Sequence, residues 1–311
     1  MSVAVVIPLY NKAATIARAL ASVQAQTLPP DEVLVVDDGS TDGGADVVAA
    51  QMHPALRLIR QPNGGVSVAR NRGANESRSD WVAFLDADDE WHPAFLASVM
   101  RMAKQEPQAG VVFTNLRLST GPAAWLAGDE SGRLRDYFDF FVRNGGHGMS
   151  ASSVLVKRSV LLKVGGFPPG LTHGEDLDTW TRLAWETPVA FVPEVLAVYH
   201  VAESGRAMQA GGSRVAAGLA HNAQRCLEQL RDGRVPPALI RSTRVYAQML
   251  NTMCARELKD AGHTMDALQA LARTFPPVIT VPALGRYTHA VLRSLCPSVL
   301  LGLRRTSAAR C

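Results

Sequence analysis

Cysteine is scarce in this chain and confined to its last third. The sequence has 311 residues and only four cysteines, none in a Cys-x-x-Cys pair or at ligand spacing from a histidine: Cys226, Cys254, Cys296 and Cys311. This pattern excludes a cysteine-rich zinc site and a disulfide framework. A reducing cytoplasm is therefore the expected compartment.

Long apolar runs and a leader segment are also lacking. No stretch of 18 apolar residues occurs, so we expect no transmembrane helix. The first residues carry no basic leader, and their apolar run is interrupted at Pro8, which predicts a first strand and not a signal peptide. No Gly-x-Gly-x-x-Gly follows that strand, which excludes a dinucleotide-dependent oxidoreductase.

Charge is distributed unevenly along the chain. Through Ser204 there are 17 basic and 23 acidic residues, a net charge of −6, whereas from Gly205 onward 15 basic and 5 acidic residues give +10. The two parts are therefore expected to have different partners, and the basic rear part suits nucleic acid, anionic lipid or an anionic polymer.

Short apolar runs alternate with helical periodicity over the first two thirds of the chain. Residues 3–7 are continuously apolar, as expected for a strand buried on both faces, and Ile16, Leu20 and Val23 then recur at helical spacing. Repetition of this unit predicts an α/β sheet. From Gly205 the strand signals stop and helical stripes continue. We therefore predict an α/β domain at 1–204 and a basic, all-helical region at 205–311.

Polar side chains follow three of the predicted strands, at the edge where ligands gather in such sheets. Asp86 and Asp88 stand two apart at a strand end, so their carboxylates point to the same side and can converge on one divalent cation. A solvated acidic turn is the alternative for a lone Asp-x-Asp. Three groups at one sheet edge favour a site: Pro8, Tyr10 and Asn11, then Asp37 and Asp38, then Asp86 and Asp88.

Five motifs in order resemble those of family 2 glycosyltransferases: VIPLYN at 6–11, VVDDGSTD at 35–42, NGGVSVARNRG at 63–73, FLDADD at 84–89 and GEDLDTW at 174–180. The resemblance implies a GT-A-type fold, with a nucleotide-sugar half at 1–115 and an acceptor half at 116–204. It also implies that the reaction inverts the anomeric carbon.

The resemblance assigns the donor site to Pro8, Tyr10, Asn11, Asp37, Asp38, Arg70, Asp86 and Asp88. Tyr10 offers a flat face for stacking on a base, and Asp38 can accept hydrogen bonds from base and ribose. Arg70 either meets the diphosphate or steadies the acidic cluster. The alternatives are packing for Tyr10, helix capping for Asp38 and an exposed surface position for Arg70.

Asp88, with Asp86, is the expected ligand of Mg²⁺ or Mn²⁺, which offsets charge on the departing nucleoside diphosphate. Many relatives carry Tyr-Arg-x-His after the last strand, whereas His200 stands two positions early and Ala202 fills that slot. Either a shifted loop brings His200 to the metal, or the site lacks this ligand.

Asp176 is the expected general base, which takes the proton of the acceptor hydroxyl. Stabilisation of a helix dipole is its alternative role. Asp178 is interpreted as an orienting or acceptor-side group. The acceptor side is expected to include four residues: Trp91, His92, Glu175 and Trp180.

The sequence thus predicts metal-assisted, inverting transfer from a nucleoside-diphosphate sugar, with a UDP-sugar favoured, to a hydroxyl of a glycan or lipid-linked glycan. No nucleic acid partner is expected. The basic helices are a cover over the sheet, a dimer face or a membrane contact, with residues 299–305 suited to the inner face of the cell membrane. The rivals are a sugar nucleotidyltransferase, for which residues 8–12 lack a Gly-rich phosphate loop, and a non-catalytic glycan-binding or scaffold protein.

Overall fold

The computed structural model describes residues 1–51, 53–121, 124–126, 130–201 and 212–273. These residues divide into two compact units. Unit 1 holds residues 1–137 and 147–201, and unit 2 holds residues 138–146 and the described chain from Gly212 on. The expected boundary between residues 204 and 205 lies outside the described residues.

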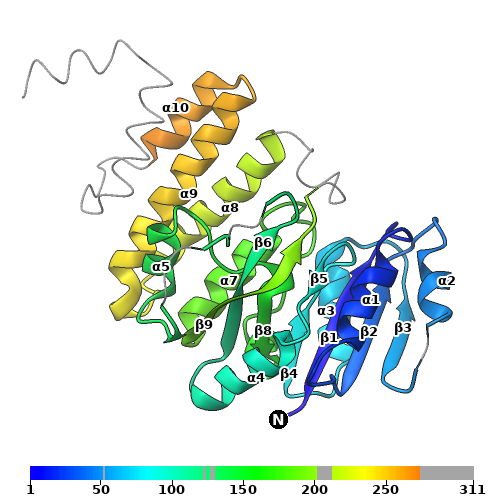
Figure 1. Ribbon diagram of the computed structural model, residues 1–311. Helices are drawn as coiled ribbons and strands as arrows, with labels where there is room; N and C mark the ends of the chain where they lie inside the picture. The colour runs from blue at the N-terminus through cyan, green and yellow to red at the C-terminus, as the bar shows by residue number, and fades with distance from the viewer. Residues whose placement is uncertain (52, 122–123, 127–129, 202–211, 274–311) are drawn as a thin grey trace, which may run out of the picture. The chain divides into compact units, whose positions relative to one another are not determined.

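Unit 1 is built on one mixed sheet, to which the described residues contribute nine strands in the order β3-β2-β1-β4-β8-β6-β9-β5, with β7 paired to β9 (Figure 1). Parallel pairing joins β1 to β2 and β4, whereas β8 runs antiparallel to both β4 and β6. The strands are β1 (Val3–Leu9), β2 (Glu32–Asp37), β3 (Leu56–Arg60), β4 (Trp81–Phe84), β5 (Glu90–Trp91), β6 (Val111–Leu118), β7 (Gly132–Arg133), β8 (Val154–Lys157) and β9 (Val189–Tyr199).

Helices follow most strands of unit 1. They are α1 (Ile16–Gln24), α2 (Gly44–Ala49), α3 (Val66–Glu76), α4 (Phe95–Gln105), α6 (Arg158–Lys163) and α7 (Glu175–Glu186), with a 3-10 turn at Ala151–Ser153. Helix α5 (Tyr137–Arg143) begins at Tyr137 in unit 1, and its other residues belong to unit 2. The alternation of strand and helix over the first four strands confirms the predicted α/β sheet.

The core of unit 1 explains why these segments fold as they do. Every residue of β1 except Pro8 is buried, which requires the continuous apolar run seen in the sequence. On α1, Ile16, Leu20 and Val23 lie on one face and join the same core cluster. A fully buried aliphatic side chain of this kind contributes about 1.5–3 kcal/mol to the stability of the fold. The apolar centre therefore stabilises the sheet, and the strand ends can carry polar residues.

Residues 119–150 are Gly-rich and mixed in the sequence, and they contain β7 and α5. In α5 only Asp139 and Arg143 are exposed, and they form an ion pair at 2.8 Å. The other positions are apolar, mostly aromatic and buried, so the helical period is not visible in the sequence.

The local sequence predicts a short helix capped by Ser159 and a last strand over residues 189–192, and both boundaries are wrong. Ser159 does not cap a helix, because α6 already begins at Arg158, whose backbone N–H donates to the carbonyl of Asp80 at 2.9 Å. The last strand, expected to end at Val192, continues to Tyr199. A bulge in the pairing with β6 absorbs Pro193 and Glu194, so proline does not end the strand.

Unit 2 is helical, as the sequence predicts for this region. Tyr246 is fully buried with ring centroids 5.1 Å from Phe138 and 4.9 Å from Phe141. None of the described helices is both long and apolar enough to cross a membrane, and residues 299–305 lie outside the described residues. The helices are α8 (Gly212–Arg231), α9 (Ile240–Asp260) and α10 (Thr264–Ala272), with a 3-10 turn at Pro237–Leu239.

Close packing of α3 on β1 gives a first prediction. A Cβ added to Gly73 would lie 2.4 Å from Val6 Cγ1, and overpacking of this kind costs about 1–3 kcal/mol, which outweighs a gain of up to ~1 kcal/mol in helix propensity. Gly73→Ala should therefore lower the free energy of unfolding in a urea titration. Gly121→Ala is the matched control, since nothing lies within 4 Å of its added Cβ. Equal effects of the two variants would contradict the packing argument.

Candidate active site

One arginine joins two carboxylates of the site. Arg70 on α3 donates from Nη2 to Asp86 Oδ1 at 2.8 Å and from Nη1 to Glu175 Oε1 at 3.0 Å. Burial alone would lower the pKa of Arg70, but the carboxylates of Asp86 and Glu175 outweigh it and hold the pKa above its ordinary value. The side chain is 4% exposed, so the alternative of an exposed surface arginine is wrong. Arg70 therefore connects Asp86, which follows β4, to Glu175, the first residue of α7.

The neighbouring Asn71 holds the segment against which Arg70 packs. Its amide donates to the carbonyl of Phe167 and accepts from the backbone N–H of Phe167, each at 2.7 Å. A Cβ added to Gly166 would lie 2.3 Å from Asn71 Oδ1, and Gly166 has a φ of +67°, so only glycine fits there. The Arg70 guanidinium lies 5.2 Å from the centre of the Phe167 ring, which adds a cation–π contact.

Ser152, in the turn before β8, fixes the backbone around the carboxylates. Its hydroxyl donates to Asp89 Oδ2 at 2.5 Å and accepts from the backbone N–H of Asp86 at 3.1 Å. Asp89 Oδ1 accepts from the backbone N–H of His200 at 3.0 Å. Burial raises the pKa of Asp89 well above its usual range, and the charge of Asp86 adds to the rise. Asp89 therefore ties β5 to the end of β9.

Asp88 already has a cationic partner. Its Oδ2 accepts from Lys12 Nζ at 2.5 Å, with side-chain exposures of 11% for Asp88 and 29% for Lys12. Its backbone carbonyl accepts from the guanidinium of Arg18 on α1. The loop after β1 and helix α1 thus both hold the residue that the sequence singles out as the metal ligand.

Asp176 lies in the first turn of α7, where its Oδ1 accepts from the backbone N–H of Leu177 at 2.7 Å. Burial raises the pKa of Asp176 to about 7, and the Glu175 carboxylate adds to the rise, while Arg70 and the Leu177 N–H oppose it. A carboxyl group with a pKa near neutrality can take up and release a proton at physiological pH, which is what a general base requires.

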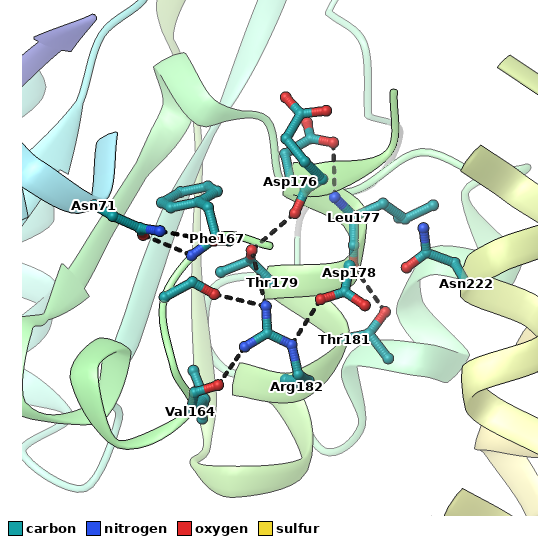
Figure 2. Close-up of polar contacts among 12 residues, drawn as sticks. Asn71, Val164, Phe167, Asp176, Leu177, Asp178, Thr179, Thr181, Arg182 and Asn222 are labelled. Carbon is teal, nitrogen blue, oxygen red and sulfur yellow. Dashed lines mark hydrogen bonds and ion pairs between the residues drawn. The ribbon is translucent and has the colours of Figure 1, made fainter. Parts of the chain in front are cut away.

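An internal clamp holds the start of α7 in place (Figure 2). Arg182 donates from Nε to Asp178 Oδ2 at 2.7 Å, and its guanidinium also reaches the carbonyls of Val164 and Gly166. The Asp178 side chain is 0% exposed. Asp178 therefore orients the helix, and the acceptor-side alternative for this residue is wrong.

The loops after β1 and β2 hold each other. Asn11 adopts a left-handed backbone with a φ of 51°, and its side-chain oxygen accepts from the backbone N–H of Thr41 at 2.8 Å. Asp37 Oδ1 accepts from the backbone N–H of Ser40 at 3.0 Å. Tyr10 is 46% exposed, so the alternative of ordinary packing is wrong and its ring is accessible to a ligand.

Asp38 organises the loop before α3. Its Oδ1 accepts from Gln61 Nε2 at 2.7 Å and from the backbone N–H of Gly64 at 2.9 Å, and its Oδ2 accepts from the backbone N–H of Gly65 at 2.8 Å. Helix α2 begins at Gly44 with no side-chain cap. The capping alternative for Asp38 is therefore wrong.

Two aromatic residues expected on the acceptor side are buried in the core. Trp91 is 4% exposed, its indole N–H donates to the carbonyl of Ser152 at 2.6 Å, and its ring stacks on Phe95 with centroids 4.1 Å apart. Trp180 is 0% exposed and packs edge-to-face on Phe167 at 5.5 Å. Neither ring presents a face to an acceptor, so both residues are reassigned to packing. His92 is exposed and stays a prediction.

Asp86 and Asp88, which follow β4, suit a divalent cation that binds together with the phosphates of a substrate. His200 Nε2 lies 3.4 Å from Glu90 Oε1, and among the described residues no three His, Cys, Asp or Glu side chains are grouped to hold a metal. Within the same residues, Asp86 Oδ2 and Asp88 Oδ1 accept no hydrogen bond. Mg²⁺ and Mn²⁺ commonly bind one or two carboxylates and complete their shell with water and substrate phosphates, so this donor set suits a shared site.

Sequence reasoning missed four residues of this network: Lys12, Asn71, Asp89 and Ser152. Asp89 carried a signal, since it extends the acidic cluster at a strand end. Lys12 directly follows Asn11 in the first motif and Asn71 directly follows Arg70 in the third, so their positions pointed to the site. Ser152 carried no signal, because its role depends only on tertiary contacts.

The Arg70 bridge gives a second prediction. Arg70→Met should lower the free energy of unfolding by about 3–5 kcal/mol, because Asp86 and Glu175 would lose their shared counter-ion. Arg72→Met is the matched control on the same helix, since Arg72 is 43% exposed and lies 4.0 Å from Glu76, and should cost at most about 1 kcal/mol. Urea denaturation at neutral pH measures both, and a loss from Arg70→Met as small as the control would contradict the bridge.

Comparison with known sequences places these motifs in a family. The profile of Glycosyl transferase family 2 matches residues 4–165. An uncharacterized protein of Mycobacterium tuberculosis, MT1568, is 30% identical over 214 residues, which are 63% of this chain and 66% of that protein. The succinoglycan biosynthesis protein ExoW of Rhizobium meliloti is 50% identical over 98 residues, 30% of this chain and 31% of ExoW. The chain thus covers less than two thirds of the length of these relatives.

Solved structures share the fold. S. aureus TarS 1–349 in complex with UDP matches with a TM-score of 0.70 and 17% identity, over 97% of this chain and 92% of that one. The mannosyltransferase PcManGT from Pyrobaculum calidifontis, in complex with GDP-Man and Mn²⁺, matches with a TM-score of 0.59 and 24% identity, over 95% and 87%. These matches confirm the predicted GT-A-type fold. Because the family profile spans more than half of the sequence and includes the motifs that carry Arg70, Asp86 and Asp88, this chain belongs to glycosyl transferase family 2.

Proposed function

We propose that this chain transfers a sugar from a nucleoside-diphosphate sugar to a hydroxyl of a glycan or lipid-linked glycan, with inversion at the anomeric carbon. The observation that carries the proposal is the buried Arg70, which pairs with Asp86 after β4 and with Glu175, the residue beside Asp176. The ion pairs of Arg70 thus connect Asp86, a carboxylate suited to the diphosphate, with the residue directly before Asp176, the carboxylate suited to proton removal.

The donor would bind at the loops after β1, β2 and β4. The exposed ring of Tyr10 can stack on the base. Among the described residues, Asp38 Oδ2 accepts one hydrogen bond, from the backbone N–H of Gly65. A carboxylate oxygen can accept a second bond, from base or ribose. UDP and GDP-Man in the structural relatives support a nucleotide sugar as the donor, with a UDP-sugar favoured. In this arrangement residues 1–115 are the nucleotide-sugar half and 116–204 the acceptor half.

The diphosphate would sit against Asp86 and Asp88 together with Mg²⁺ or Mn²⁺, which supplies positive charge to stabilise the leaving group. Arg70 is committed to its two carboxylates, so its role is to hold Asp86 in position and not to contact phosphate. His200 approaches Glu90 and is not proposed as a ligand.

Asp176 would act on the acceptor. As the acceptor oxygen forms its bond to the anomeric carbon, its proton passes to the Asp176 carboxylate, and the bond from that carbon to the diphosphate oxygen breaks. Attack from the side opposite the leaving group inverts the configuration. The Glu175 carboxylate, which pairs with Arg70, lies beside Asp176 and raises the affinity of Asp176 for the proton.

A glycan acceptor fits the relationship to ExoW, a succinoglycan biosynthesis protein. The proposed location is the cytoplasm, with the inner face of the cell membrane as the place where a lipid-linked acceptor is met. The remaining acceptor-side proposals are His92, which is exposed, and Glu175, which stands directly before Asp176.

The experiment that tests the function is a panel of UDP- and GDP-sugars, incubated with the protein with and without Mn²⁺ while release of nucleoside diphosphate is followed. Mn²⁺-dependent release from at least one sugar supports transfer. Binding of nucleotide sugars without any release, with or without glycan acceptors, would favour the non-catalytic glycan-binding alternative.

Asp176→Asn should reduce transfer by at least about 10²-fold, because general base catalysis contributes about 10²–10⁴-fold, while leaving UDP affinity unchanged. Initial rates and calorimetric UDP binding measure the two effects. Asp46→Asn, at a side chain that is 85% exposed, is the control and should retain full activity. Full activity of Asp176→Asn would remove this residue from the base role.

The pH dependence of kcat/KM should report the Asp176 carboxyl of the free enzyme. With a pKa of about 7, the carboxyl is ionised and competent above that pH and protonated and incompetent below it. We expect kcat/KM to be level above about pH 7 and to fall about tenfold per unit below it. A profile that stays level down to pH 5 would contradict the assignment.

A further inference from the structure

Lys12 forms an ion pair with Asp88, the carboxylate to which the proposed function assigns the divalent cation. Its Nζ lies 2.5 Å from Asp88 Oδ2. We propose that Lys12 is a displaceable counter-ion of Asp88, so that tight binding of the divalent cation requires the nucleoside diphosphate to be bound as well. This inference rests on the proposed function, because it assumes that Asp88 receives a cation together with a diphosphate.

Lys12 and Arg70, which pair with the carboxylates of Asp88 and Asp86, differ in how firmly they are held. Arg70 is 4% exposed and is held by two carboxylates and by the Phe167 ring. Lys12 is 29% exposed, and its ammonium is carried on a flexible four-carbon stem. Arg70 is therefore fixed in the site, whereas Lys12 can change partners.

The local backbone keeps Asp88 in place when Lys12 leaves. Arg18 donates to the backbone carbonyl of Asp88, and the next residue, Asp89, is bonded through its side chain to Ser152 and His200. The backbone next to Lys12 is fixed as well, because the side-chain oxygen of Asn11 accepts a hydrogen bond from the backbone N–H of Thr41. Only the flexible part of Lys12 has to move.

The charges make the two binding events depend on each other. A divalent cation alone must compete with the ammonium of Lys12 for Asp88, whose side chain is only 11% exposed, and its binding breaks an ion pair at 2.5 Å. When a diphosphate is present, its negative oxygens offer that ammonium a new partner. Metal and diphosphate therefore favour each other, and the coupling is reciprocal.

Mn²⁺ and UDP are the probes for the test. Lys12→Met and Lys12→Gln remove the charge, and Lys104→Met on α4, at an exposed position, is the matched control. Binding of Mn²⁺ alone is followed by the electron paramagnetic resonance of free Mn²⁺, and UDP binding is measured by calorimetry with and without Mn²⁺. Circular dichroism and thermal unfolding verify that each variant is folded.

Both Lys12 variants should bind Mn²⁺ alone more tightly than the wild type, on the order of tenfold, a typical size for such coupling. The factor by which Mn²⁺ improves UDP binding should shrink in both variants and stay unchanged in Lys104→Met. Asp88→Asn should lose Mn²⁺ binding, which verifies that the measured site is the intended one.

Unchanged or weaker Mn²⁺ binding in the Lys12 variants, with UDP and Mn²⁺ still binding to the wild type, would overturn the role of Lys12 and leave the proposed function standing. A wild type that binds neither UDP nor GDP in the presence of Mn²⁺ would overturn both.

Discussion

The shared pairing of Arg70 with Asp86 and Glu175 is the interaction on which the geometry of the site depends. These carboxylates come from distant parts of the chain and would repel each other if they approached without a cation between them. The arginine itself would be costly to bury without two carboxylate partners. Each member therefore requires the others, and packing of α3 on β1, together with the Asn71 clamp on Phe167, fixes where the three meet.

Much of the sheet was predictable because its signal is local. A strand buried on both faces needs a continuous apolar run, and β1, β2 and β4 show one. The elements that escaped prediction lack such a signal. Helix α5 is apolar on nearly all sides, β5 and β7 are two residues each, and the length of β9 depends on a bulge opposite β6. These features depend on neighbouring elements and not on their own sequence.

The residues of the site likewise divide into those with a local signal in the sequence and those that depend on tertiary contacts. Motif residues at strand ends could be located from sequence, because parallel strands bring their carboxyl ends to one edge. The partners of those residues could not, since Lys12 and Ser152 are defined only by what the fold brings next to Asp88 and Asp89. Trp91 and Trp180 were misplaced for a related reason: an aromatic residue beside a motif resembles a sugar-binding surface, but here the rings complete the core.

The insertion of β8 between β4 and β6 has a consequence for synthesis on the ribosome. β4 gains its second neighbour only from a strand that is translated much later, after β5, α4 and β6. Until then the nascent chain carries an unpaired strand edge, of the kind that promotes association between chains. Arg70 likewise waits for Glu175, which emerges later still. A protein of this topology is therefore most exposed to misassembly midway through translation, and slow passage of residues between β4 and β8 through the exit tunnel would lengthen that period.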